Sequence, residues 1–257
     1  MIYQELYLVV NKVESTFPMD QVKEFTVEAG RPDSITREKL EVLRKHGITR
    51  ISINPQTMKQ ETLDLIGRRH TVEQVKETFR LARELGFDNI NMDLIIGLPG
   101  EGKEEVAHTL QEVENLHPDS LTIHSLALKR ATRLNLFKDK YEEMSFENSQ
   151  EIMEMTQQCA RNMGMGPYYL YRQKNIAGNF ENVGYAEVDK AGIYNILIME
   201  EKQTILAAGA GASTKFVFEH GTRIERVENV KDVNNYILRI DEMLERKRVG
   251  IEKYLNG

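Results

Sequence analysis

Residues 89–100 read NINMDLIIGLPG, and this stretch decides the fold class. An apolar side chain stands at every even position from 90 to 96, and a polar one stands at 89, 91 and 93. Because successive side chains of a strand point to opposite faces, the pattern predicts a strand with one aliphatic and one polar face. A parallel strand buried on both sides is apolar throughout. The polar row therefore lies either at a half-solvated sheet edge or against other polar groups.

The same asymmetry recurs in three further predicted strands, at residues 24–30, 50–56 and 120–128. Their polar sides, with that of the 89–96 strand, carry a titratable or amide side chain towards the strand end: Glu28, Gln56, Asp93 and His124. Helices are predicted at residues 2–17, 36–46, 60–66, 72–85 and 103–116, with Thr36 and Thr71 as N-caps. This alternation of strands and helices predicts right-handed βαβ units and a parallel sheet.

The shared polar face favours a barrel over a doubly wound sheet. A doubly wound sheet has helices on both faces and requires apolar residues on both, whereas a barrel has helices outside and a lumen inside. An ordinary (β/α)8 barrel fills its lumen with bulky aliphatic side chains. The polar lumen predicted here favours an open or partial barrel with a polar ligand at the carboxyl ends of its strands. The doubly wound sheet stays as the alternative.

Composition excludes several classes of protein. The 257 residues have a net charge of −6 with both signs interspersed, which gives no electrostatic footprint for nucleic acid. No apolar run approaches the roughly 18 residues that span a bilayer, and the first residues lack a signal-peptide pattern. The single cysteine, Cys159, excludes a disulfide framework and a metal site built from several thiolates of this chain. We therefore expect no metal ligands here, and a cytoplasmic location.

Four motifs stand in a recognisable order: TVEA at 26–29, RISINPQ at 50–56, LIGRRH at 65–70 and DLIIGLPG at 93–100. Together they resemble the radical S-adenosylmethionine (SAM) enzymes of the oxygen-independent coproporphyrinogen III oxidase family. The later segments YLYRQKN at 169–175 and ENVGY at 181–185 look like the coproporphyrinogen dehydrogenase-like subgroup. The resemblance covers nearly the whole chain.

The resemblance implies an α/β fold: a partial TIM-type (β/α)6 barrel that binds S-adenosylmethionine and a [4Fe–4S] cluster. Residues 1–132 would form strands 3 to 6 of that barrel with their helices, and residues 133–257 an α+β accessory region that covers the substrate. The implied activity is that of an oxidoreductase in haem and porphyrin biosynthesis. It decarboxylates propionate side chains of coproporphyrinogen III oxidatively to vinyl groups and needs an electron donor.

By motif, the resemblance implies that the cofactor is bound by Glu28, Gln56, Arg68, Asp93 and Ala127. The residue types suit the ligand, because a sulfonium zwitterion presents an ammonium group, a carboxylate and two ribose hydroxyls. Catalytic residues stay unassigned. His124, Lys129 and Arg130, at or just past a strand end, either hold substrate propionates or are ordinary solvated side chains.

The chain departs from the family in one large respect. The family holds its cluster with three cysteines spaced Cys-x3-Cys-x2-Cys and has a Gly-rich motif after the next strand, and neither is present. We therefore expect a fragment or a truncated relative that neither assembles a cluster nor starts radical chemistry by itself. The alternative function is that of a chaperone for haem or another tetrapyrrole, since close relatives share the barrel and bind haem.

The pattern after residue 133 is weaker. It predicts a helix at residues 147–163, strands at 168–172, 194–200 and 216–218, and a terminal helix at 230–246. Small residues at 206–213 are typical of a close backbone approach to another surface.

Overall fold

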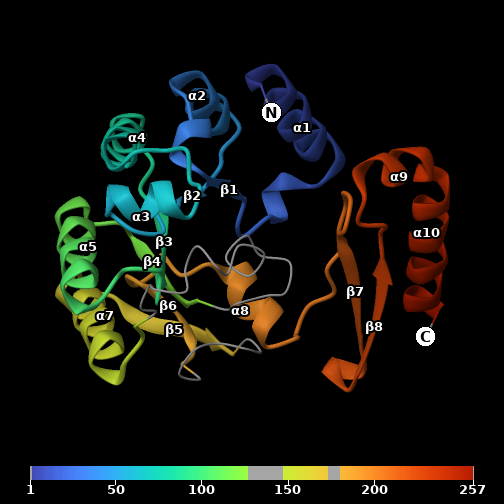
Figure 1. Cartoon of the computed structure of the whole chain (residues 1–257). Coiled ribbons are helices and arrows are strands. Elements are labelled where there is room, and N and C mark those ends of the chain that lie inside the picture. Colours follow the sequence, from blue (N-terminus) through green and yellow to red (C-terminus); the bar gives the residue numbers. More distant parts are fainter. Residues whose placement is uncertain (1, 127–146, 173–179, 257) are drawn as a thin grey trace. The chain divides into compact units, whose positions relative to one another are not determined.

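The computed structural model describes residues 2–126, 147–172 and 180–256 and divides into two compact units, Met1–Gly192 and Ile193–Gly257 (Figure 1). The elements of the first unit are α1 (Tyr3–Thr16), η1 (Met19–Gln21), β1 (Thr26–Gly30), η2 (Pro32–Ser34), α2 (Arg37–Lys45), β2 (Arg50–Ile53), α3 (Gln60–Leu65), α4 (Val72–Glu84), β3 (Ile90–Ile96), α5 (Lys103–Leu116), β4 (Ser120–Ser125), α7 (Gln150–Asn162), β5 (Gly166–Tyr171) and β6 (Asn182–Ala186). Those of the second unit are α8 (Ile193–Met199), β7 (Ser213–Phe218), η5 (Glu219–Gly221), β8 (Arg223–Glu228), α9 (Val233–Leu238) and α10 (Ile240–Asn256).

The first unit is built on one sheet with the strand order β1-β2-β3-β4-β6-β5. The four strands predicted from their alternation, β1 to β4, are parallel, as expected for βαβ units. Strand β6 is antiparallel to both of its neighbours, β4 and β5. The register places Thr26 beside Arg50 and Asn91 beside Ser120, so the polar side chains of neighbouring strands share one face.

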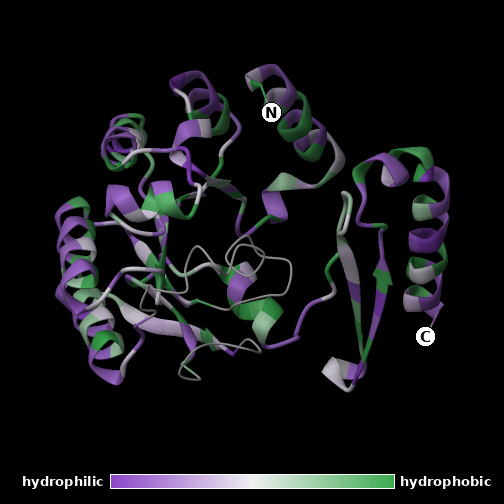
Figure 2. Cartoon of the chain, viewed as in Figure 1, coloured by the Kyte–Doolittle hydropathy of each residue, from purple (hydrophilic) through white to green (hydrophobic). Residues whose placement is uncertain are grey.

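Helices cover the aliphatic face of this sheet. One core cluster joins the strand residues Ile51, Ile53, Ile90, Met92, Leu94, Ile96, Leu121 and Ile123 to buried residues of α1, α2, α4, α5 and α7. These helices form an arc outside the sheet (Figure 1), and their ribbons carry both hydrophobic and hydrophilic residues (Figure 2). The buried hydrophobic residues of the helices pack in the core cluster with the strands. Each such buried side chain contributes about 1.5–3 kcal/mol relative to an exposed one. In the described part of the unit, this one-sided covering is that of a partial barrel, as predicted.

The predicted N-caps are confirmed. The Thr36 hydroxyl accepts a hydrogen bond from the backbone N–H of Lys39 at 3.4 Å. At the start of α4, Thr71 and Gln74 form a complete capping box, in which each side chain accepts from the other residue's backbone N–H. These bonds satisfy N–H groups that have no partner within the helix. They help to fix the residues at which α2 and α4 begin.

Between residues 147 and 192 the first unit gains the helix α7 and the strands β5 and β6, which extend its sheet. The helix predicted at 147–163 is α7, and the strand predicted at 168–172 is β5. Strand β6 was not predicted and pairs with both β4 and β5. The boundary expected between residues 132 and 133 lies outside the described residues and stays a prediction.

Two predictions for the second unit are wrong. The strand predicted at 194–200 is instead the helix α8 (Ile193–Met199), because a short apolar run such as IYNILIM does not distinguish a helix from a buried strand. Residues 230–246 form parts of two helices instead of one. Asp232 caps α9 by accepting from the Asn235 N–H at 2.8 Å, and the second helix begins at Ile240. The predicted strand at 216–218 lies within β7, which pairs with β8.

Candidate functional site

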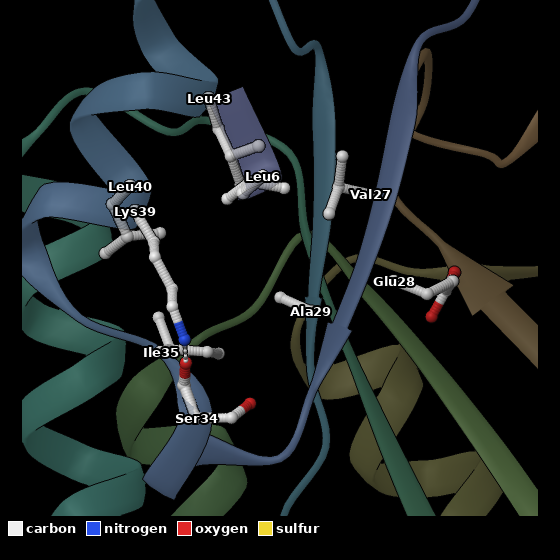
Figure 3. Close-up of a pocket in the computed structure, with 9 residues that line it drawn as sticks. All are labelled: Leu6, Val27, Glu28, Ala29, Ser34, Ile35, Lys39, Leu40 and Leu43. Atoms are coloured by element: carbon white, nitrogen blue, oxygen red, sulfur yellow. Dashed lines mark hydrogen bonds between the residues drawn. The ribbon is translucent and has the colours of Figure 1, made fainter. Parts of the chain in front are cut away.

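The polar face of the sheet is a connected network that crosses β1 to β4. The Oε1 of Glu28 lies 3.7 Å from the Nη1 of Arg50. Arg50 is almost fully buried and donates from Nη2 to the Oγ of Ser120 at 3.2 Å. Ser120 donates in turn to the Oδ1 of Asn91 at 3.0 Å. Figure 3 shows Glu28 on the opposite side of β1 from Leu6, which belongs to the helical face.

Asp93 lies in the middle of this network. Its Oδ1 accepts a hydrogen bond of 2.7 Å from the Nδ2 of Asn91. Its Oδ2 is 3.8 Å from the Nε2 of His124, which is longer than a hydrogen bond. Asp93 is one-fifth exposed, so its carboxylate lies at the boundary between the buried network and solvent.

Strand β5 adds two tyrosines to the polar face. The hydroxyl of Tyr171 is 3.2 Å from the Nδ1 of His124, and Tyr169 donates to the Oγ1 of Thr122 at 3.4 Å. The two phenol rings stack with centroids 6.2 Å apart and an angle of 9°. Burial raises the pKa of the Tyr169 phenol, which therefore stays a neutral hydrogen-bond donor. We did not predict these two residues, although their shared parity in the 168–172 strand is a usable signal.

Gln56 lies beyond the end of β2, which stops at Ile53 and not at residue 56 as predicted. Pro55 has no N–H to donate to a strand ladder, which favours this early end. Gln56 has a left-handed backbone with φ +69° and still pairs with β3: its N–H donates to the Asp93 carbonyl at 3.0 Å, and its carbonyl accepts from Ile95 at 2.9 Å. The backbone of Gln56 is thus held against that of Asp93.

Arg68 follows α3 and is partly buried, whereas Arg69 beside it is exposed. Burial lowers the pKa of the Arg68 guanidinium and the charge of Arg31 adds to this effect, while the carboxylates of Asp33 and Asp93 oppose it. A guanidinium stays protonated under these conditions. Arg68 therefore brings a fixed positive charge into the field of Asp93.

A buried carboxylate joins the two loops that carry Gln56 and the Gly/Pro turn. Glu101 is 2% exposed, and its Oε1 accepts a 2.6 Å hydrogen bond from the Thr57 hydroxyl. The Thr109 hydroxyl, from α5, lies 3.2 Å from the Thr57 hydroxyl and accepts from the Met58 N–H at 3.1 Å. Burial raises the pKa of Glu101. These bonds fix the loop after β2 relative to the loop after β3.

The residue types present do not fit an iron–sulfur centre. Cys159 is buried in α7, donates to the Leu110 carbonyl at 3.7 Å, and has a pKa raised by burial to about 12. Such a thiol is a poor metal ligand, because thiolates bind metals and iron–sulfur clusters need several of them. Within residues 2–126, 147–172 and 180–256, no group of three or more His, Cys, Asp or Glu side chains is placed to hold a metal ion.

Of the five residues expected to bind the cofactor, the structure brings three close together. Gln56 pairs with β3 at Asp93, and Arg68 interacts electrostatically with Asp93. Glu28 lies two strands away on the same polar face. Ala127 lies outside the described residues, as do Lys129 and Arg130, which were considered for the substrate.

Comparison with known proteins assigns the family. Residues 4–113 match the profile of the Radical SAM superfamily. The oxygen-independent coproporphyrinogen-III oxidase-like protein HemZ of Bacillus subtilis (strain 168) is 49% identical over 251 residues, which are 97% of this chain and 50% of that protein. The chain belongs to the radical SAM superfamily, among the oxygen-independent coproporphyrinogen III oxidase-like proteins. It spans about half the length of this relative.

Two further matches, one to a curated protein and one to a solved structure, are reported beside it. The heme chaperone HemW of the same organism is 36% identical over 115 residues, 45% of this chain and 30% of that protein. The solved structure of coproporphyrinogen III oxidase (HemN) from Escherichia coli, a radical SAM enzyme, matches with a TM-score of 0.69 at 22% identity. That match covers 94% of this chain and 54% of HemN, and it shows the fold. No helix in the described parts of the chain is long and apolar enough to cross a membrane.

Proposed function

We propose that this radical SAM chain carries the S-adenosylmethionine-binding part of a protein that acts on coproporphyrinogen III. The reaction class is oxidative decarboxylation of propionates to vinyl groups in haem biosynthesis. The name of the 49%-identical relative supports the substrate class. One structural observation carries the cofactor part: Asp93, on a continuous polar face, is close to the backbone of Gln56 and within the field of Arg68.

The side chains of the polar face match the groups of S-adenosylmethionine. In the proposal, Asp93 accepts from the ribose hydroxyls, Arg68 pairs with the methionine carboxylate, and Glu28 and Gln56 take the ammonium group and the remaining polar contacts. Hydrogen bonds in which a carboxylate or a guanidinium group takes part are about twice as strong as those between neutral groups. Glu28 has a side chain that is 62% exposed, so it is accessible to a ligand. Ala127 is retained in the proposal on the resemblance alone.

The scaffold suits a ligand that must be held in one geometry. Network residues on β1 to β4 are fixed by a parallel sheet, and Thr57 and Glu101 join the loops beyond the strand ends. Side chains on rigid elements, supported by further hydrogen bonds, position a ligand more accurately than loop residues do. When bound, S-adenosylmethionine supplies the radical that removes hydrogen from the substrate.

The proposal assigns no cluster to this chain, because its single cysteine is a buried, protonated thiol. An electron donor and the cluster cysteines of the family are further partners in the proposal, and the reaction requires them. A cytoplasmic location is proposed as well, since the lone thiol needs no oxidising compartment.

A second candidate function is that of a haem or tetrapyrrole chaperone. The 36% identity to the heme chaperone HemW over 115 residues favours it. That match covers 45% of this chain, whereas the match to the oxidase-like relative covers 97%. The oxidase-like function is therefore the better supported of the two.

The two functions predict different ligands for the chain: S-adenosylmethionine for the oxidase-like function and haem for the chaperone. The experiment titrates the 257-residue chain separately with S-adenosylmethionine, by calorimetry, and with haemin, by visible absorption. The proposal predicts saturable, one-to-one binding of S-adenosylmethionine. Stoichiometric haemin binding with no heat from S-adenosylmethionine would favour the chaperone and contradict the proposal.

A further inference from the structure

The side-chain amide of Asn91 is held between hydroxyl donors and a carboxylate. Its Oδ1 lies 3.0 Å from the Oγ of Ser120 and 3.3 Å from the Oγ1 of Thr122. Its Nδ2 lies 2.7 Å from the Oδ1 of Asp93. An ionised carboxylate only accepts hydrogen bonds, so the amide nitrogen must face Asp93 and the amide oxygen must face the two hydroxyls.

Groups further along the network determine the direction in which those hydroxyls donate. Arg50 only donates, so the Oγ of Ser120 accepts from its Nη2 and directs its own proton to Asn91. Tyr169 likewise donates to the Oγ1 of Thr122, which leaves the Thr122 proton for Asn91. Both branches therefore converge on Asn91, which is 3% exposed, and pass through its amide to Asp93.

We propose that Asn91 is a positioning residue for Asp93: it holds one carboxylate oxygen so that the other accepts from a vicinal diol of the ligand. The inference rests on the proposed function, in which that diol is the ribose of S-adenosylmethionine. Asn91 itself is too deeply buried to contact a ligand. The Oδ2 of Asp93, which is 3.8 Å from His124, is the oxygen left for the diol.

The test replaces the side-chain amide of Asn91, which donates to Asp93, with a carboxyl group of nearly the same shape. In the Asn91→Asp variant, two carboxyls lie within hydrogen-bond distance, so they share one proton at low pH and repel each other when both are ionised. Among the residues that the structure describes, the charged or titratable groups that interact with Asp93 include His124 from β4, Arg68 after α3 and Tyr169 from β5. Because the unsubstituted chain contains all three, its own pH profile is the reference for their effects.

The measurement is calorimetric binding of S-adenosylhomocysteine, which carries the same ribose, at about pH 5.5 and about pH 8. We expect Asn91→Asp to bind nearly as well as the unsubstituted chain at the lower pH and about tenfold or more weakly at the higher pH. Asn91→Ala, which has no donor at either pH, is expected to bind about tenfold more weakly at both. Asn115→Asp makes the same change on the exposed face of α5 and is the matched control.

Several results would overturn the inference. These are an Asn91→Asp effect that is the same at both pH values, an effect equal to that of Asn115→Asp, or unchanged affinity in Asn91→Ala. If Asn91→Asp does not fold, as judged by circular dichroism, the Asn91→Ala result decides.

A different result separates this inference from the proposed function. If the unsubstituted chain binds no S-adenosylhomocysteine and no S-adenosylmethionine, the proposed function is wrong. A 13C titration of the introduced carboxyl in Asn91→Asp then tests the positioning contact without a ligand. A pKa for that carboxyl well above the ordinary range supports the contact with Asp93, and ordinary titration contradicts it.

Discussion

Gly184 of β6 lies directly under the ring of Tyr169 of β5. The two residues pair across the strands, and a Cβ placed on Gly184 would be 1.9 Å from the Cε1 of Tyr169. Real Cβ atoms do not approach other atoms so closely, so only glycine allows this ring position. The ring in turn reaches the Thr122 hydroxyl. The position of Tyr169 on the polar face therefore depends on the absence of a side chain at residue 184.

The first prediction follows from this contact. We expect Gly184→Ala to displace the Tyr169 ring, break its contact with Thr122 and destabilise the fold by about 1–3 kcal/mol. The matched control is Gly166→Ala on the partner strand, where an added Cβ meets nothing within 4 Å, and its effect should stay within about 0.5 kcal/mol. Urea unfolding gives the free energies, and near-ultraviolet circular dichroism reports the tyrosines, since the chain has no tryptophan. Equal effects of the two substitutions would contradict the account.

A second prediction concerns the pH dependence of stability at Glu101. Burial raises the pKa of this carboxyl above its unfolded value, so its stabilising contribution is complete below about pH 4.5 and is lost as the pH rises through the folded pKa. Glu101→Gln can still accept from Thr57 and does not ionise. We therefore expect the stability of this variant, relative to the unsubstituted chain, to increase with pH by about 1.4 kcal/mol for each unit of the pKa shift.

The measurement for Glu101 is urea unfolding at a series of pH values between about pH 4.5 and about pH 8. Glu104→Gln removes an exposed carboxylate from the first turn of α5, the helix that follows the loop of Glu101, and is the control. A stability difference between Glu101→Gln and the unsubstituted chain that does not change with pH would show that Glu101 is not held in a low-dielectric site.

The third prediction concerns iron. We expect anaerobic incubation of the 257-residue chain with iron and sulfide to give no [4Fe–4S] chromophore, because the one thiol is buried and its pKa is raised to about 12. Visible absorption after desalting measures the outcome. Cys159→Ser should give the same spectrum, and a chromophore that is present in the unsubstituted chain but lost in this variant would contradict the assignment of Cys159 as a structural residue.

Much of the first unit could be predicted because its signals are local. Alternation at residues 90–96 correctly separated the aliphatic face from the polar one, and the Thr71 capping box correctly placed the start of α4. The connectivity of the polar face could not be predicted in the same way. Which hydroxyl meets Asn91 depends on the register that pairs it with Ser120, and register is a long-range property of two strands.

Other features were missed for identifiable physical reasons. Residues 182–186 contain a glycine and form a five-residue strand, β6, whose periodicity is too brief to detect. Gln56 leaves the strand at Pro55 in a left-handed conformation, which alternation does not describe. The burial of Glu101 was missed as well. This residue follows the Gly/Pro turn, but its hydrogen-bond partner Thr57 lies in another loop, and no local pattern indicates such a contact.

The central claim is that the polar face binds S-adenosylmethionine through Asp93, and calorimetric titration of the chain and its variants tests this most directly. We predict that Asp93→Ala weakens binding at least about tenfold, because hydrogen bonds to a charged group contribute about 1.5–3 kcal/mol. Glu28→Ala should also weaken it. Asp88→Ala, which removes a carboxylate that is 84% exposed, should change the affinity less than about twofold. Affinity that is unchanged in both Asp93→Ala and Glu28→Ala would contradict the claim.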